Sequence, residues 1–84
     1  MIWFVYMLRC KDNSIYTGIT NNLDNRIETH MSGNGSKYLR GRLPVELIYK
    51  EDFSNRSSAS KREIEVKKLN KKEKELLIKY AKQL

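Results

Sequence analysis

The sequence IYTGITNNLDNRIETH, residues Ile15 to His30, decides the expected fold of this chain. It predicts a strand that ends in a tight glycine turn and continues directly into a helix. Tyr16 and Gly18 are expected at the end of this strand. Arg26 and His30 lie four residues apart and therefore share one face of that helix. A phenol, a guanidinium and an imidazole near a helix N-terminus suit a phosphate group. We therefore expect the functional site in this stretch.

The residues before this stretch predict the other arm of a hairpin. Residues 2–8 form a continuous apolar run rich in β-branched and aromatic types, which indicates a central strand covered on both faces. A three-residue loop over residues 11–13 would set Tyr6 opposite Gly18 and would bring Tyr6 and Tyr16 onto one face, within contact distance. A two-residue turn would put the two tyrosines on opposite faces. We expect the three-residue loop.

The helix that follows has recognisable ends and one apolar stripe. Thr20 or Asn21 is the expected N-cap, and Gly33 is the expected glycine at the C-terminal end. Apolar residues at four-residue spacing predict the buried side of this helix. They are Leu23, Ile27 and Met31.

The second half of the chain predicts a third strand and two more helices. Residues 36–42 suit one short helical turn, and alternating polar and apolar residues predict a strand over residues 45–53. A helix is expected from a cap within residues 55–58 to about residue 69, where Asn70 marks a break. The last helix is expected over residues 71–82. Its predicted apolar face consists of Leu76, Leu77 and Tyr80.

Composition and charge favour a small domain with a polyanionic partner. The 84 residues predict one domain over 1–84, and 17 Lys and Arg against 10 Asp and Glu give a net charge of +7. Nucleic acid is the commonest partner of so basic a domain, and a merely solvated surface is the alternative. Cys10 is the only cysteine, which fits a buried apolar role in a reducing cytoplasm. The apolar run near the start is too short for a membrane span, and no signal peptide is expected.

Glu63 is the candidate metal ligand. Together with Ala59, Val66 and Asn70 it follows one helical stripe, which places a carboxylate beside apolar neighbours near the sheet. A lone carboxylate there could hold one Mg²⁺ or Mn²⁺, with water and phosphate oxygens as the other ligands. Two structural alternatives stand beside this role: a capping box that starts at Ser60, and an ion pair from Glu63 to Lys67, four residues on.

The other candidate residues are suited to phosphodiester chemistry. Tyr16 could act as a general base if a nearby cation or metal lowered its pKa, Arg26 could bind a scissile phosphate, and His30 could position water or contact phosphate. Each also has an ordinary structural alternative: a packed ring, a surface ion pair or a satisfied histidine. A basic and aromatic patch suited to a nucleic-acid backbone follows. It consists of Lys37, Tyr38, Arg40 and Arg42.

These motifs together resemble the GIY-YIG nuclease domain. The resemblance is carried by Phe4-Val5-Tyr6, by Tyr16-Thr17-Gly18 about ten residues later, and by Arg26 ten residues after Tyr16. The segment from residue 59 to residue 69 resembles the later helix of that family, which carries its single metal-binding glutamate. The match covers nearly the whole chain and is closest to the small stand-alone bacterial members, whose cellular role is generally unassigned.

The resemblance implies a fold, a reaction and a set of roles. The fold is α+β, with a central three-stranded antiparallel sheet flanked by helices, and the reaction is one-metal hydrolysis of DNA by water. Tyr16 matches the proposed general base, and Tyr6 matches the tyrosine that positions water or phosphate. Gly18 lets backbone approach the site, and Arg26 stabilises the phosphate. Glu63 matches the metal ligand, and His30 falls where relatives place a His or Tyr near the nucleophile.

The chain also departs from the family pattern. Phe4 replaces the first glycine of the first motif, Thr17 replaces the isoleucine of the second, and Ile19 stands where some repair nucleases have a lysine. Nuclease relatives usually carry a further DNA-binding domain, so a separate partner protein is one expected source of DNA affinity. The alternative function is a nucleic-acid-binding module without turnover, and a third is a protein-interaction domain. The residues do not distinguish DNA from RNA.

Overall fold

The computed structural model describes residues 2–82 and has the expected α+β architecture. Its sheet has three strands in the order β2-β1-β3, and both pairings are antiparallel. No helix within residues 2–82 is both long and apolar enough to cross a membrane. The elements in chain order are β1 (Trp3–Cys10), β2 (Ile15–Thr20), α1 (Leu23–Met31), α2 (Lys37–Arg40), β3 (Val45–Phe53), α3 (Arg56–Lys67) and α4 (Lys71–Lys82).

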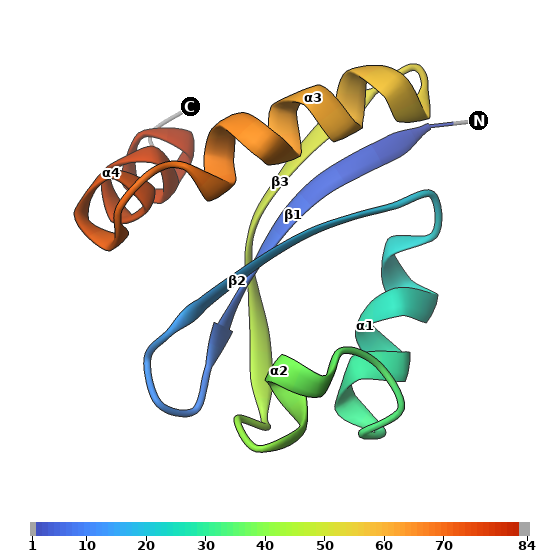
Figure 1. Ribbon diagram of the computed structural model, residues 1–84, viewed down its shortest axis with the longest axis vertical. Coiled ribbons are helices and arrows are strands. Elements are labelled where there is room, and N and C mark those ends of the chain that lie inside the picture. The colour runs from blue at the N-terminus through green and yellow to red at the C-terminus, as the bar shows by residue number, and fades with distance from the viewer. Residues whose placement is uncertain (1, 83–84) are drawn as a thin grey trace.

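The prediction of a central first strand is confirmed. β1 lies between β2 and β3, and four consecutive residues from Val5 to Leu8 are buried. Consecutive strand residues point to opposite faces, so a run of buried residues requires cover on both sides of the sheet. The helices supply that cover. Figure 1 shows α1 and α2 on one side of the sheet and α3 and α4 on the other.

Two apolar clusters correspond to these two faces. Tyr6 and Leu8 pack with Leu39 on the side of α1 and α2, and Cys10 lies there as a buried free thiol, as expected. Met7, from the other face of β1, packs with the buried residues of α3 and α4. These are Val66 and Ile78. Because the face of Tyr6 is covered only by the short helices α1 and α2, polar groups can approach it from the sheet edge.

The hairpin between β1 and β2 has the predicted three-residue loop. Tyr6 pairs with Gly18, and Cys10 donates its backbone N–H to the carbonyl of Ser14 at 2.9 Å. Asn13 takes the left-handed conformation with φ of 69°, which asparagine tolerates better than most residues. The loop length is odd, so Tyr6 and Tyr16 lie on the same face.

β3 spans the predicted residues, but its alternation is interrupted. Met7 pairs with Tyr49, whereas the next residue of β1 pairs with Leu47, so Ile48 is an extra residue in β3. Beyond a bulge of this kind, each side chain of the strand points to the face opposite to the one that simple alternation would give it. Val45 therefore packs on the α1 and α2 side while Tyr49 packs on the other, and Leu47 remains 38% exposed.

The start of α1 corrects the sequence prediction. Asn22 caps this helix, since its side chain accepts from the backbone N–H of Asn25 at 3.2 Å, so the caps predicted at Thr20 or Asn21 were too early. The Thr20 hydroxyl instead accepts from the N–H of Asn22 at 3.1 Å and stabilises the turn out of β2. Met31, predicted to be buried, is 45% exposed because α1 ends at its own residue.

The C-terminal end of α1 confirms the role expected of Gly33. Its φ is +83°, and its N–H donates to the carbonyl of His30 at 3.1 Å. The N–H of Asn34 donates to the carbonyl of Thr29 at 3.2 Å, which completes a Schellman motif. A residue with a side chain would be strained in this left-handed conformation.

α3 begins earlier than a cap at Ser60 would require. Asn55 caps this helix by accepting from the N–H of Ser58 at 2.8 Å, so Ser60 and Glu63 lie within the helix and the capping-box alternative is wrong. The predicted pair between Glu63 and Lys67 is present at 3.3 Å. Glu63 therefore belongs to the body of α3, where its position is set by helix packing on the sheet.

The predicted buried side of α4 is confirmed at Leu77 and wrong at Leu76 and Tyr80. Ile78 is 4% exposed and Leu77 packs beside it, whereas Leu76 is 43% and Tyr80 64% exposed. The helix is oriented by a charged contact as well as by its apolar residues. The Glu75 carboxylate accepts from both terminal nitrogens of Arg9 on β1, at 2.6 and 2.9 Å. A bidentate pair of this kind adds geometric specificity to the contact between α4 and β1.

Candidate active site

Two phenols form the centre of the candidate site. Tyr6 of β1 and Tyr16 of β2 have ring centroids 6.3 Å apart, on the sheet face that α1 and α2 cover. This proximity follows from the hairpin register, in which Tyr6 pairs with Gly18 two residues beyond Tyr16. The prediction that the two tyrosines share one face and lie within reach of each other is confirmed.

Gly18 provides the space that the Tyr6 phenol occupies. A Cβ atom at position 18 would lie 2.7 Å from the Tyr6 hydroxyl and 3.2 Å from Cε1 of Tyr16. Both distances are shorter than ordinary contacts, so a side chain here would displace the phenols. The glycine is therefore required by packing across the strand pair rather than by an unusual backbone conformation.

Buried His30 forms a hydrogen bond with the Tyr6 hydroxyl. Its ring is buried, with 1% exposure, and its Nε2 lies 3.0 Å from the Tyr6 oxygen. Its Nδ1 accepts from the backbone N–H of Ser36 at 3.3 Å, so the proton of the neutral ring must sit on Nε2. His30 thus donates to Tyr6, and the phenolic proton of Tyr6 is left to point elsewhere. Because both ring nitrogens are engaged in the interior, the geometry does not favour the direct contact with water or phosphate that the sequence suggested.

Burial and nearby charges together set the pKa of Tyr6. Burial and the neighbouring Tyr16 raise the pKa of Tyr6 to about 12, and the negative charge of Glu63 acts in the same direction. The Arg26 guanidinium opposes this rise. A phenol with so high a pKa stays protonated at neutral pH and serves as a hydrogen-bond donor. Arg26 and Glu63, which are 37 residues apart in the sequence, are thus both close enough to act on one phenol.

The pKa of His30 gives a first prediction. Burial first, and the Arg26 charge second, hold the pKa of this imidazole below its ordinary value of 6.5. The unfolded chain therefore binds more protons than the folded one as the pH falls below 6.5, and the free energy of unfolding must decrease there. Since His30 is the only histidine, an NMR titration of its ring protons measures the pKa directly. A midpoint at or above 6.5 would contradict the buried, neutral donor.

Glu63 belongs to α3, which covers the other side of the sheet, and its charge acts on Tyr6. Its helical neighbours Ala59 and Val66 are fully buried, and its own side chain is 20% exposed. The carboxylate pairs with Lys67 at 3.3 Å, and the Lys67 side chain is 55% exposed and can exchange for another cation. Residues 2–82 contain no cluster of three or more His, Cys, Asp or Glu that could hold a metal ion. The donor set thus fits only a metal that takes one carboxylate from the protein and most ligands from water and substrate, as Mg²⁺ commonly does.

The basic and aromatic patch divides into two parts. Tyr38 stacks on Tyr16 with ring centroids 6.1 Å apart, and Arg42 lies 4.0 Å from the centre of the Tyr38 ring. Arg42 also pairs with Asp12 at 3.0 Å, so its charge is partly engaged. Lys37 and Arg40 are exposed. The structure therefore brings Tyr38 against Tyr16 and Arg42 against Tyr38, and leaves the other two residues as surface charges.

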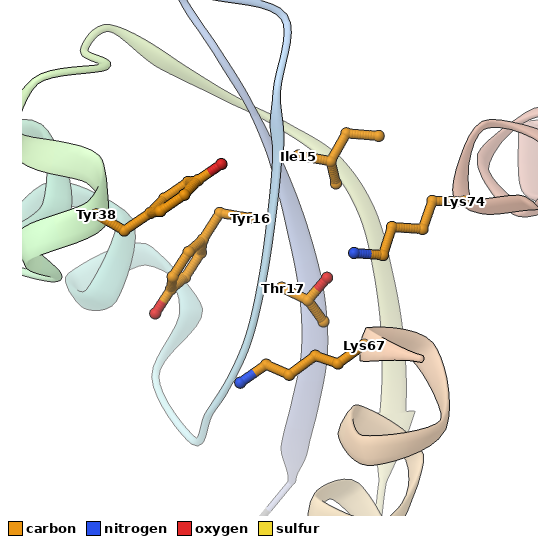
Figure 2. Close-up of a pocket in the computed structure, with 6 residues that line it drawn as sticks. All are labelled: Ile15, Tyr16, Thr17, Tyr38, Lys67 and Lys74. Carbon is orange, nitrogen blue, oxygen red and sulfur yellow. The ribbon is translucent and has the colours of Figure 1, made fainter. Parts of the chain in front are cut away.

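A hollow of about 290 Å³ lies along the open edge of β2. Figure 2 shows Tyr16 and Tyr38 on one side of this strand and two lysine side chains approaching from the other. The hollow therefore joins the phenol side of the sheet to the side of α3 and α4. Its lining residues are Ile15, Tyr16, Thr17, Tyr38, Lys67 and Lys74.

Two residues of the site escaped the sequence analysis. Gly35 was assigned no role from the sequence, but a Cβ atom there would lie 2.1 Å from Nδ1 of His30. Ser36 supplies the backbone N–H that fixes the tautomer of the same ring. The glycine itself was the available signal, since a glycine outside a turn often marks a close approach, although its partner in space cannot be read from the chain.

Comparisons with known proteins agree on one family. The family profile described as the GIY-YIG catalytic domain matches residues 2–76. A UPF0213 protein of Clostridium perfringens is 53% identical over 75 residues, covering 89% of this chain and 81% of the relative. UPF0213 protein YazA of Bacillus subtilis is 51% identical over 75 residues, covering 89% of this chain and 76% of the relative. The solution NMR structure of a UPF0213 protein from Bacillus halodurans has a TM-score of 0.63 at 45% identity, over 95% of this chain and 85% of that one.

Proposed function

The chain belongs to the GIY-YIG catalytic domain family, a nuclease-type family, and from this premise we propose that it is a metal-dependent endonuclease that hydrolyses DNA phosphodiester bonds with water as the nucleophile. The proposal is carried by one observation: the Tyr6 hydroxyl receives a hydrogen bond from buried His30, touches the space left by Gly18, and is influenced by the charges of Arg26 and Glu63.

In this proposal the two phenols have different tasks. Tyr6 is a hydrogen-bond donor, because its pKa of about 12 keeps it protonated and His30 already fills an acceptor position on its oxygen. It can orient the attacking water or a phosphate oxygen. Tyr16 lies at the hollow and is the candidate that accepts the proton of water. The asymmetry between a buried donor and an accessible acceptor supports this division.

Arg26 and Glu63 contribute charge of opposite sign. The Arg26 guanidinium would bind the scissile phosphate and offset the negative charge that develops on it. Glu63 would hold a single Mg²⁺ or Mn²⁺ after its exchange with Lys67, and the ion when bound supplies Lewis-acid stabilisation of the phosphate and the leaving oxygen. Positioning and electrostatics would provide most of the rate acceleration, as is general for phosphoryl transfer.

The net charge of +7 and the ring of Tyr38 beside Tyr16 support nucleic acid as the partner. A nucleic-acid strand that enters the hollow can stack a base on an aromatic ring and place its phosphate backbone against basic side chains. The buried free thiol of Cys10 fits a reducing compartment such as the cytoplasm. A partner protein could add affinity that this surface does not supply by itself.

Cleavage that depends on a divalent metal is the direct test. Purified protein is incubated with branched, nicked and single-stranded DNA in the presence of Mg²⁺ or Mn²⁺, and parallel reactions contain a chelator. We expect products on at least one substrate only when metal is present. Binding without products on every substrate, with the salt dependence of a phosphate contact, would instead establish the nucleic-acid-binding module. The absence of both cleavage and salt-dependent binding would reject a nucleic-acid function.

A further inference from the structure

Thr17 carries an unusual hydroxyl. The residue is 4% exposed, and its Oγ1 is a buried side-chain oxygen for which residues 2–82 provide no hydrogen-bond partner. A buried hydroxyl without a partner is destabilising, and native structures seldom keep one without a reason. This position is held by isoleucine in the motif that gives the family its name, and an apolar side chain would fill it without any unmet hydrogen bond.

Two ammonium groups approach the same space. Figure 2 shows Lys67 from α3 and Lys74 from α4 extending toward Thr17, which lines the hollow with them. Lys67 is paired with Glu63, but no carboxylate of the described chain pairs with the ammonium of Lys74. The lining of the hollow includes no acidic residue. The groups that converge are therefore hydrogen-bond donors, two of them positively charged, and their shared complement is a phosphate oxygen.

We propose that Thr17, Lys67 and Lys74 bind a backbone phosphate adjacent to the one that is hydrolysed. Thr17 follows Tyr16 in β2, so their side chains point to opposite faces, and the hollow joins these faces around the open strand edge. A nucleic-acid strand that crosses this edge presents one phosphate to the phenols and the next to the lysines. The inference rests on the proposed function for the meaning of the neighbouring phosphate, but the binding site itself requires no catalysis.

Salt-dependent binding without metal tests the site. Fluorescence anisotropy of a labelled single-stranded oligonucleotide is measured in chelator over a series of salt concentrations. The site loses one phosphate contact in Lys74→Gln, so affinity should fall about fivefold at 0.1 M salt and the slope of log K against log salt should decrease by about 0.7. Thr17→Val should weaken binding with an unchanged slope, because the hydroxyl is uncharged. Its melting temperature should stay the same or rise, since an unsatisfied buried group has been removed.

Lys72→Gln is the matched control. Lys72 is exposed on the same helix, about 200° around the axis from Lys74, and it does not line the hollow. Equal effects of the two lysine substitutions, or no binding by the wild-type protein, would overturn the proposed site. A specific effect of Lys74→Gln in a protein that cuts no DNA would keep this site and reject the nuclease. Metal-dependent cleavage by a protein whose two lysine variants bind DNA equally well would keep the nuclease and reject this phosphate site.

Discussion

Glu63→Gln is expected to reduce metal-dependent DNA cleavage by at least about a hundredfold, the size of effect that follows the loss of one electrostatic contact to a transition state. The negative charge of this carboxylate acts on Tyr6, which places Glu63 among the groups that influence the phenol. Glutamine keeps the shape and one hydrogen-bond acceptor but removes the charge that attracts a metal ion. The rate of product formation at saturating Mg²⁺ and Mn²⁺ measures the loss.

The fold should survive this substitution. The pair between Glu63 and Lys67 joins residues four apart on one helix, and such pairs contribute less than about 0.5 kcal/mol. Affinity for DNA should be unchanged or higher, because a negative charge near the phosphate has been removed. A loss of activity that came with a large decrease in melting temperature would therefore point to a structural role and contradict our assignment.

Glu65→Gln supplies a matched control on the same helix. Glu65 is exposed and pairs with Arg62 at 3.3 Å, so the control also removes one negative charge and one ion pair. Cleavage by this variant should equal that of the wild type. Undiminished cleavage by Glu63→Gln would instead indicate a contaminating nuclease or a different metal ligand.

Local sequence patterns were sufficient for the positions of the strands and for the register of the β1–β2 hairpin, but not for the bulge at Ile48 in β3. The alternation over residues 45–53 defined β3, and the odd loop over residues 11–13 placed Tyr6 and Tyr16 on one face. These features depend on residues near one another in the sequence, where the period of a strand and the length of a loop leave few options. The influence of the Glu63 charge on Tyr6 could be expected only from the family resemblance, because it depends on how α3 packs on the sheet.

Features set by contacts between distant segments were predicted less well. Leu76, Leu77 and Tyr80 fit an apolar stripe by spacing, but of these only Leu77 packs in the core, and it does so beside Ile78, which the spacing had left out. The role of Gly35 likewise depends on the chain turning back after the end of α1. This turn brings the glycine against the ring of His30, five residues before it. Neither contact leaves a periodic signal in the sequence.

Gly35→Ala is expected to be the most destabilising single methyl addition in the site. The new Cβ atom would lie 2.1 Å from Nδ1, 2.9 Å from Cε1 and 3.0 Å from Cα of His30, and the last of these atoms belongs to a helix backbone that cannot easily move. Overpacking of this kind costs about 1–3 kcal/mol, and loss of the hydrogen bond from Ser36 to Nδ1 adds about 1 kcal/mol. In a domain of this size the sum of about 2–4 kcal/mol should lower the melting temperature by roughly 8–32 °C.

Gly41→Ala controls for the general effect of adding a methyl group. A Cβ atom at position 41 meets nothing within 4 Å, and the φ of −92° suits alanine, so this variant should be as stable as the wild type or slightly more stable. The steric cause can be isolated with His30→Ala as a second background. There the imidazole is absent, and Gly35→Ala should cost little or fill part of the space, which gives a large coupling energy in a double-mutant cycle. If Gly35→Ala lowered the free energy of unfolding equally in both backgrounds, the glycine would be needed for its backbone conformation and not to make room for His30. The proposed support of the Tyr6 hydroxyl by a tightly enclosed imidazole would then lose its structural basis.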